Sequence, residues 1–160
     1  MNIDSQLITE VTHFINQESD MLDYKEYADW LKLWSETGLY IVPVDHSNTD
    51  YKNSLNIAYD DAEMRVMRTD RLLSGEAVST QYAEKTVRTL SRIRVVGEED
   101  GLINVRCAYC LYEHKKGKIR SFPANVEFKL RRLDDSFLIE QKVINILLSD
   151  QHLKTVSYIF

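Results

Sequence analysis

Residues 14–34 read FINQESDMLDYKEYADWLKLW, and this stretch decides the fold. Asp23 suits the N-cap of a helix, and Glu26 follows three residues later, where its side chain can reach back to the cap. Two tryptophans and a tyrosine on that helix need a wide apolar surface opposite them, so we expect the helix to lie as a lid on a sheet. The alternative is an aromatic wall for a small apolar ligand. The apolar face, at steps of three and four residues, consists of Tyr27, Trp30, Leu31 and Trp34.

The rest of the first half predicts two further helices and two short strands. The lid helix should end near Trp34, with Gly38 as its stop signal. A polar loop should join the two strands. The expected elements are a helix from Asp4 or Ser5 to about residues 17–19, strands at residues 39–44 and 55–59, and a helix from Asp60 to Gly75.

From residue 86 onward the apolar period changes to two, which is typical of strands. The alternation is clearest where Val126, Phe128 and Leu130 alternate with charged residues. A four-strand antiparallel meander with three helices on one face gives an α+β architecture, and a strongly curved sheet wrapped around the helices would make a cone. A bulge is expected near residues 131–133, and the apolar tail at residues 155–160 is a candidate for packing against a neighbour. The expected strands cover residues 86–96, 102–115, 119–133 and 137–148.

Composition limits the class of protein. The 160 residues suit a single domain over residues 1–160. The net charge is -5 and the basic residues are scattered, which disfavours nucleic-acid binding. No run approaches the roughly 20 apolar residues of a membrane span, and MNIDSQLITE at the start has neither the basic residues nor the apolar core of a signal sequence. Two cysteines make no disulfide framework, so a cytoplasmic location is expected.

Candidate metal ligands are few in this sequence. Cys107 and Cys110 form a C-x-x-C motif, but residues three apart in a strand point to opposite faces, which favours buried thiols. A Rieske cluster needs C-x-H and C-x-x-H pairs, and mononuclear iron needs two histidines and a carboxylate; neither pattern is present. No catalytic, cofactor or metal site is therefore expected. The histidines, none at a metal-binding spacing from another, are His13, His46, His114 and His152.

Two groups of polar residues are candidates for a function. Glu113, His114 or Tyr112 would supply a general acid or base if its side chain pointed into the core. Four arginines on neighbouring strands would share a polar face, either as a solvated surface or as a subunit contact with an acidic partner surface. These arginines are Arg88, Arg92, Arg94 and Arg106.

Two segments resemble the small (beta) subunit of Rieske-type aromatic-ring-hydroxylating dioxygenases. The first, residues 14–34 followed by LYIVPV, has the E-x-x-x-L-D stretch, the aromatic-W-L-x-L helix and a strand ending in tyrosine and proline. The second, residues 58–95, has the D-D start, an arginine-rich helix ending R-L-x-x-G and an entry to the first long strand. The matching residues are Glu18, Leu22, Asp23, Tyr27, Trp30, Leu31, Leu33, Tyr40 and Pro43, then Asp60, Asp61, Arg65, Arg68, Arg71, Leu72, Gly75, Thr86, Ser91 and Val95.

The resemblance implies a cystatin-like (NTF2-like) cone and a non-catalytic structural subunit for the dihydroxylation of an aromatic compound. It also implies that a large (alpha) subunit carries the Rieske [2Fe-2S] cluster and a mononuclear iron, while this chain carries no cofactor. Three small subunits would form a trimer beneath three large ones, as a hetero-hexamer. The alternative function is a freestanding isomerase, dehydratase or binding protein of the same fold, which would need an inward-facing Asp or His with a tyrosine partner.

Overall fold

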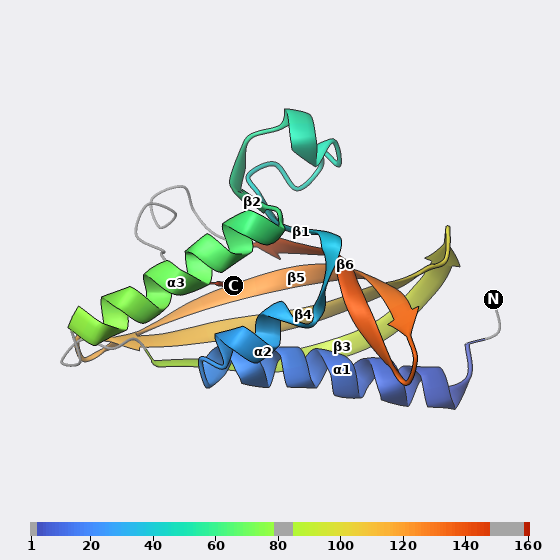
Figure 1. The fold of residues 1–160 in the computed structure, drawn as a ribbon, viewed down its shortest axis with the longest axis horizontal. Coiled ribbons are helices and arrows are strands. Elements are labelled where there is room, and N and C mark those ends of the chain that lie inside the picture. The colour runs from blue at the N-terminus through green and yellow to red at the C-terminus, as the bar shows by residue number, and fades with distance from the viewer. Residues whose placement is uncertain (1–2, 79–84, 148–158) are drawn as a thin grey trace.

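The computed structural model describes residues 3–78, 85–147 and 159–160, and it has the expected α+β fold (Figure 1). The strands of this described part form one sheet in the order β2-β1-β6-β5-β4-β3. Neighbouring strands are antiparallel except β1 and β6, which are parallel. The elements are α1 (Ser5–Asp23), α2 (Tyr27–Leu31), β1 (Trp34–Pro43), the 3-10 helix η1 (Tyr51–Asn53), β2 (Asn56–Asp60), α3 (Ala62–Val78), β3 (Lys85–Glu99), β4 (Leu102–Lys115), β5 (Lys118–Leu133) and β6 (Ser136–Ile146).

The long strands separate an inner face, which carries the core, from an outer face. In β5, Phe122, Val126 and Leu130 are buried on the inner face, while the residues on either side of each are exposed. Figure 1 shows α1 running along the long strands, where it packs against β3, and α3 lying near β1 and β2. The core therefore fills the space between the helices and the concave inner face. None of the helices in the described residues is long and apolar enough to cross a membrane.

The stretch that decides the fold forms different elements from those its helical period predicts. α1 continues to Asp23 instead of ending near residues 17–19, so Asp23 is the last residue of one helix and not the cap of the next. α2 is a single short helix, and Trp34 belongs to β1. The helix ends early because the backbone of Trp34 pairs with β6, opposite Ile139. Pairing with a distant strand overrides the local helical pattern here.

The aromatic side chains of this stretch are nevertheless buried together. Tyr27, Trp30 and Trp34 are each less than 10% exposed and belong to the core. The indoles of Trp30 and Trp34 meet edge to face, with ring centroids 5.4 Å apart. The ring of Trp34 continues the cluster to Tyr40 at 6.4 Å. This face therefore covers the sheet as expected, although only part of it is helical.

Two helix boundaries also differ from those expected from the sequence. Gly38 does not stop a helix but lies inside β1, where a Cβ would come within 2.6 Å of the carbonyl oxygen of Ile139. α3 begins at Ala62, after Asp61, whose carboxylate accepts a hydrogen bond from the N–H of Met64 at 3.0 Å. The helix passes through Gly75 because a single glycine weakens a helix without ending it.

The sheet is bent at bulges that the sequence did not place correctly. The expected bulge at residues 131–133 is wrong, since the pairing of β5 with β6 is regular there and shifts between Lys129 and Leu130 instead. A second irregularity lies in β3 between Ser91 and Arg94, where Arg92 has a positive φ of 54°. A bulge re-aims the side chains that follow it.

The tail of the chain packs inside its own fold. Residues 155–158 of the expected apolar tail lie outside the described part. Ile159 and Phe160 are 2% and 3% exposed and belong to the core. The mark for the C-terminal end lies over the middle of the sheet (Figure 1).

Candidate functional site

A charged pair lies inside the core, between α1 and β6. Glu18 and Lys142 are both fully buried, and Nζ of Lys142 lies 2.8 and 2.9 Å from the two carboxylate oxygens of Glu18. Nε1 of Trp30 donates a hydrogen bond of 2.6 Å to the same carboxylate. Burial lowers the pKa of Lys142, and the carboxylate of Glu18 opposes that shift. Two charges so far from water are stabilised only because each supplies the other's counter-charge.

A second charged pair lies in the same interior, between α1 and β3. The guanidinium of Arg88 pairs with the carboxylate of Asp23, which also accepts hydrogen bonds from the backbone N–H of Arg88 at 2.8 Å and the hydroxyl of Thr86 at 2.9 Å. The Arg88 side chain is 2% exposed. Asp23 therefore ties the end of α1 to the first long strand.

Three side chains from three strands hold the backbone of Ile159 and Phe160. The N–H of Phe160 donates to the hydroxyl oxygen of Tyr40 at 2.9 Å, and a backbone oxygen of Phe160 accepts from Nζ of Lys142 at 3.3 Å. The carbonyl oxygen of Ile159 accepts from the guanidinium of Arg88. We name Tyr40, Arg88 and Lys142 the tail cradle.

Aromatic rings surround the tail cradle. The ring of Phe160 meets that of Phe122 edge to face, with centroids 5.7 Å apart. Nζ of Lys142 lies 5.8 Å from the ring centroid of Tyr109. The Tyr109 hydroxyl is buried without a hydrogen-bond partner among the described residues, and burial raises the pKa of Tyr109. The Tyr109 hydroxyl is thus one of several buried polar groups with unused hydrogen-bonding capacity in the described part of the chain.

The predicted acid–base candidates in β4 are not brought together. Glu113 is on the inner face, 1% exposed, and pairs with Arg120 at 2.8 Å. Tyr112 and His114 are its neighbours in the strand, so they point to the opposite, outer face and are exposed. Tyr112 and His114 share the outer face, but the carboxylate of Glu113 lies on the inner face, so the three side chains do not form one acid–base site.

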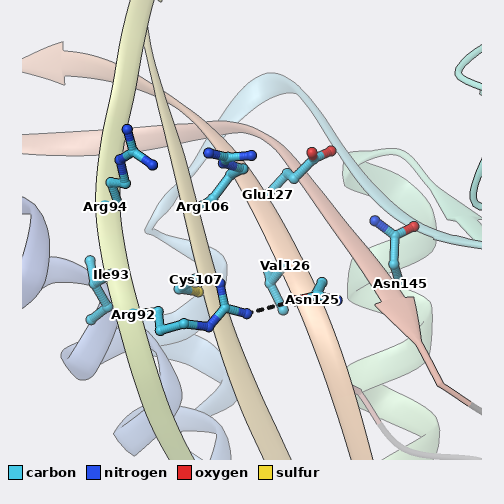
Figure 2. A pocket seen from close by; sticks show the side chains of 9 residues that line it. All are labelled: Arg92, Ile93, Arg94, Arg106, Cys107, Asn125, Val126, Glu127 and Asn145. Atoms are coloured by element: carbon cyan, nitrogen blue, oxygen red, sulfur yellow. Dashed lines mark hydrogen bonds between the residues drawn. The ribbon is translucent and has the colours of Figure 1, made fainter.

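Three of the four predicted arginines line a groove on the outer face (Figure 2), with a volume of about 720 Å³. Arg94 lies opposite Arg106 in the pairing of β3 with β4, and Glu127 lies opposite Arg106 on β5. Figure 2 shows Arg92 reaching across toward Asn125, whose Oδ1 accepts a hydrogen bond of 2.8 Å from Nη2 of Arg92. We name this surface the arginine groove; its polar side chains are Arg92, Arg94, Arg106, Asn125, Glu127 and Asn145.

The expectation that Arg88 shares this polar face is wrong, and the bulge in β3 is the reason. Residues 88 and 94 are an even number apart and would share a face in a regular strand. The irregularity between Ser91 and Arg94, with Arg92 at positive φ, shifts the alternation by one residue. Arg88 therefore points inward and Arg94 outward.

The residues that could bind a metal are dispersed. Within the described ranges, no three His, Cys, Asp or Glu side chains are grouped so as to hold a metal ion. Cys107 is buried on the inner face and Cys110 lies on the outer face of β4, so the two thiols do not converge. Burial raises the pKa of the Cys107 thiol to about 12. The exposed histidines are His13 in α1, His46 after β1 and His114 in β4, while His152 lies outside the described part.

The sequence contains a pattern that indicates this buried pair, although the helical and strand periods were interpreted only for their apolar residues. Glu18 lies at helical steps from Phe14 and Leu22, which are buried on the same face of α1. Lys142 occupies an inward position of β6, as does Ile144 two residues later. A single acid on an apolar helix face and a single base on an apolar strand face together indicate a buried pair.

Comparison with known proteins gives consistent matches. A family model described as the ring hydroxylating beta subunit matches residues 17–151. The p-cumate 2,3-dioxygenase system small oxygenase component of Pseudomonas putida is 29% identical over 136 residues, covering 84% of this chain and 76% of that protein. The anthranilate 1,2-dioxygenase small subunit of Acinetobacter baylyi is 24% identical over 146 residues, covering 88% and 89%. A solved structure of naphthalene 1,2-dioxygenase with indole bound in the active site shares the fold, with a TM-score of 0.81 and 18% identity, over 99% of this chain and 88% of that chain.

Proposed function

Because the chain belongs to the family of ring-hydroxylating dioxygenase beta subunits, we propose that it is the non-catalytic structural partner of an iron-bearing large subunit. The chain is a small subunit of an aromatic-ring-hydroxylating dioxygenase that acts in the catabolism of aromatic compounds. The observation that carries the proposal is the filled interior: Trp30, Phe122 and Phe160 are all buried in the core, between the helices and the sheet. A subunit packed in this way serves as a rigid scaffold.

The charged groups of the interior also favour a scaffold over a freestanding isomerase or dehydratase. Such an enzyme needs an inward acid or base that is free to reach a substrate. The carboxylate of Glu18 is instead bonded to both Lys142 and Trp30, and that of Asp23 to Arg88. Both carboxylates therefore stabilise the fold and are not free to reach a substrate.

The described residues of this chain do not fit either iron group that the family implies. A Rieske cluster needs two cysteines and two histidines around one pair of irons. Cys107 and Cys110 lie on opposite faces of β4, and the three exposed histidines of the described part lie on separate elements. The cluster and the mononuclear iron are therefore assigned by this proposal to the large subunit.

The arginine groove is the proposed contact surface for assembly, as a trimer of this chain with three large subunits. Arg92, Arg94 and Arg106 outnumber the single carboxylate of Glu127 in the groove, while the whole chain has a net charge of -5. Such a local excess of positive charge suits an acidic partner surface, and arginine is enriched at interfaces. Arg88 is excluded from this surface by its burial.

The test is to purify this chain alone and together with its large subunit. We expect the chain alone to contain no iron and to turn over no aromatic substrate, and the complex to sediment as a hetero-hexamer. The double variant Arg94→Glu with Arg106→Glu should lower the sedimentation coefficient of the complex, whereas Arg71→Glu on the exposed side of α3 should leave it unchanged. Stoichiometric iron in this chain alone, or a chain that stays monomeric in all mixtures, would overturn the proposal.

A further inference from the structure

We propose that the arginine groove of one copy of this chain holds an acidic surface of the next copy, so that three small subunits close into a ring. This contact rests on the proposed function, which requires a trimer, and it adds the surface that occupies the groove. We name that surface the acidic end; it consists of the turns that join β3 to β4 and β5 to β6. Its exposed carboxylates belong to Glu98, Glu99, Asp100, Asp134 and Asp135.

The acidic end is a fixed part of the fold. Each of its turns has only two residues between the paired strands. Asp100 and Asp134 have φ values of 53° and 48°, as tight hairpin turns require. The two turns are neighbours because β4 and β5 pair from Leu102 and Arg131 onward, and Figure 1 shows β3 and β4 meeting at one end of the sheet. The carboxylates are therefore gathered at one end of the long strands.

The charge of the acidic end is not balanced within the described part of the chain. None of its carboxylates makes an ion pair or a side-chain hydrogen bond with a described residue. The two nearby arginines are already paired, Arg131 with Glu140 at 3.4 Å and Arg132 with Glu10 at 2.6 Å. The carboxylates are not arranged as a metal site among the described residues either. Like charges this close repel each other, so the acidic end suits a cationic partner.

The arginine groove carries the opposite unbalanced charge. Arg94 lies directly opposite Arg106, and like charges at such positions destabilise a sheet. Neither guanidinium makes a hydrogen bond or an ion pair with a described residue. A hollow of about 240 Å³ continues the groove along the outer face and adds Lys129, while Glu127 is the one carboxylate among the described residues that line the two hollows. An anionic occupant would relieve the repulsion between the two arginines.

The acidic end can fill the groove only from another copy. Arg94 and Glu98 are four residues apart in β3, so their backbones are about 13 Å apart and the strand leads away from the groove. Since the groove and the acidic end are different surfaces, a contact between two copies is heterologous. A heterologous contact closes into a ring when the rotation between copies divides a full turn. Three copies complete the ring that the proposed assembly requires.

Charge reversal tests this contact in the chain alone. Reversing the groove by Arg94→Glu with Arg106→Glu, or the acidic end by Glu99→Arg with Asp135→Arg, should raise the dissociation constant of the trimer by at least about 100-fold. Neither acidic position has a positive φ, so both turns keep their backbone. All four substitutions together exchange the charges, and this chain should regain the wild-type affinity to within about 10-fold. Sedimentation equilibrium at several concentrations measures the association.

Matched controls separate the contact from general effects of charge and folding. Glu63→Arg with Asp70→Arg makes the same change in net charge on exposed positions of α3 and should leave the trimer intact. Far-ultraviolet circular dichroism shows whether each variant is folded. If a reversed groove prevents folding, Arg94→Gln with Arg106→Gln should still weaken the trimer by about 10-fold. Raising the salt from about 0.05 to 0.5 M should weaken the wild-type and the charge-exchanged trimers alike.

Each outcome decides the proposal. Recovery in the charge-exchanged chain supports it, because only surfaces that meet can exchange their charges in this way. Reversals that leave the association unchanged, or that weaken it without recovery in the exchanged chain, overturn it. A wild-type chain that is monomeric or dimeric on its own at about 100 μM overturns it as well. The scaffold function is tested separately, by the iron content of the chain and by its complex with the large subunit.

Discussion

The guanidinium of Arg65 stacks on the indole of Trp34, with its central carbon 4.2 Å from the ring centroid. It also donates hydrogen bonds to the backbone carbonyls of Gly38 and Ser35 in β1. Burial lowers the pKa of Arg65 to about 10, and neighbouring carboxylates oppose that shift. One side chain of α3 thus fixes the helix against the first strand.

Arg65→Lys should therefore lower the free energy of unfolding by about 2–3 kcal/mol, because a lysine keeps the charge but loses the planar stack and the forked hydrogen bonds. Urea unfolding followed by tryptophan fluorescence measures this. The control is Arg71→Lys on the exposed part of the same helix, which should change stability by less than about 0.5 kcal/mol. Equal effects of the two substitutions would contradict the role given to the stack.

Lys142→Met should destabilise the protein by about 3–5 kcal/mol, because it leaves the buried carboxylate of Glu18 without its counter-charge. In the double variant with Glu18→Gln, no charge is left unpaired, and the amide oxygen can still accept from Trp30. We expect the double variant to cost at least about 1 kcal/mol less than the sum of the single variants. Additive losses in a double-mutant cycle would argue against the pair.

Gly38→Ala should cost about 2–4 kcal/mol. A Cβ at this position would lie 2.6 Å from the carbonyl oxygen of Ile139 and 3.0 Å from a ring carbon of Trp34, so β1 would have to move away from β6. Gly97→Ala is the matched control, since a Cβ there meets no atom within 4 Å. A thermal melt in which both alanine variants lose the same stability would disprove the close-approach argument.

β4 and β5 were predictable almost to the residue and β3 and β6 to within three residues, whereas the first strand was not. β4 and β5 match the expected residues 102–115 and 119–133 within one residue, because alternation of period two recurs over many positions. Trp34 was assigned to a helix because its spacing from Trp30 is helical. Its true partner is β6, about a hundred residues further along the chain, and no local pattern reports such a pairing.

Local sequence patterns also predicted only part of the candidate site. Arg94 and Arg106 were correctly expected on one polar face, since they pair across β3 and β4. Arg88 was misplaced because the bulge at Arg92 occurs at an arginine, where no glycine marks the positive φ. The cradle for Phe160 depends on three separate strands, and sequence periodicity describes only one strand at a time.

Glu140 should give the protein a pH-dependent increment of stability. Burial acts to raise the pKa of Glu140, but the hydroxyls of Thr37 and Ser35, together with Arg131, outweigh burial and hold this pKa below its ordinary 4.5. The unfolded chain then binds more protons, so the increment is complete above the ordinary pKa and is lost as pH falls through the folded-state pKa.

Glu140→Gln is accordingly expected to cost about 1 kcal/mol at neutral pH and progressively less as the pH falls to about 3. Urea midpoints of both proteins across this range measure the difference. A difference that stays constant with pH would show that the carboxylate charge is not involved.

The thiol of Cys107 should be inert in the native protein. It is 2% exposed, and its pKa of about 12 leaves almost no thiolate at mildly alkaline pH. In the variant Cys110→Ala, a thiol reagent should modify the protein only after urea is added. Rapid modification of the folded variant would show that the inner face of β4 opens to solvent.

The parallel pairing of β1 with β6 sets the order of events during synthesis on the ribosome. Leu39 lies opposite Gln141, so β6, at the middle of the sheet, is the last of the described strands to be made. Until it emerges, β1 has no neighbour on that edge, and Trp30 and Trp34 lack part of their final cover. Contacts this distant in sequence make for slow folding, and the nascent chain exposes its tryptophans until β6 has been made.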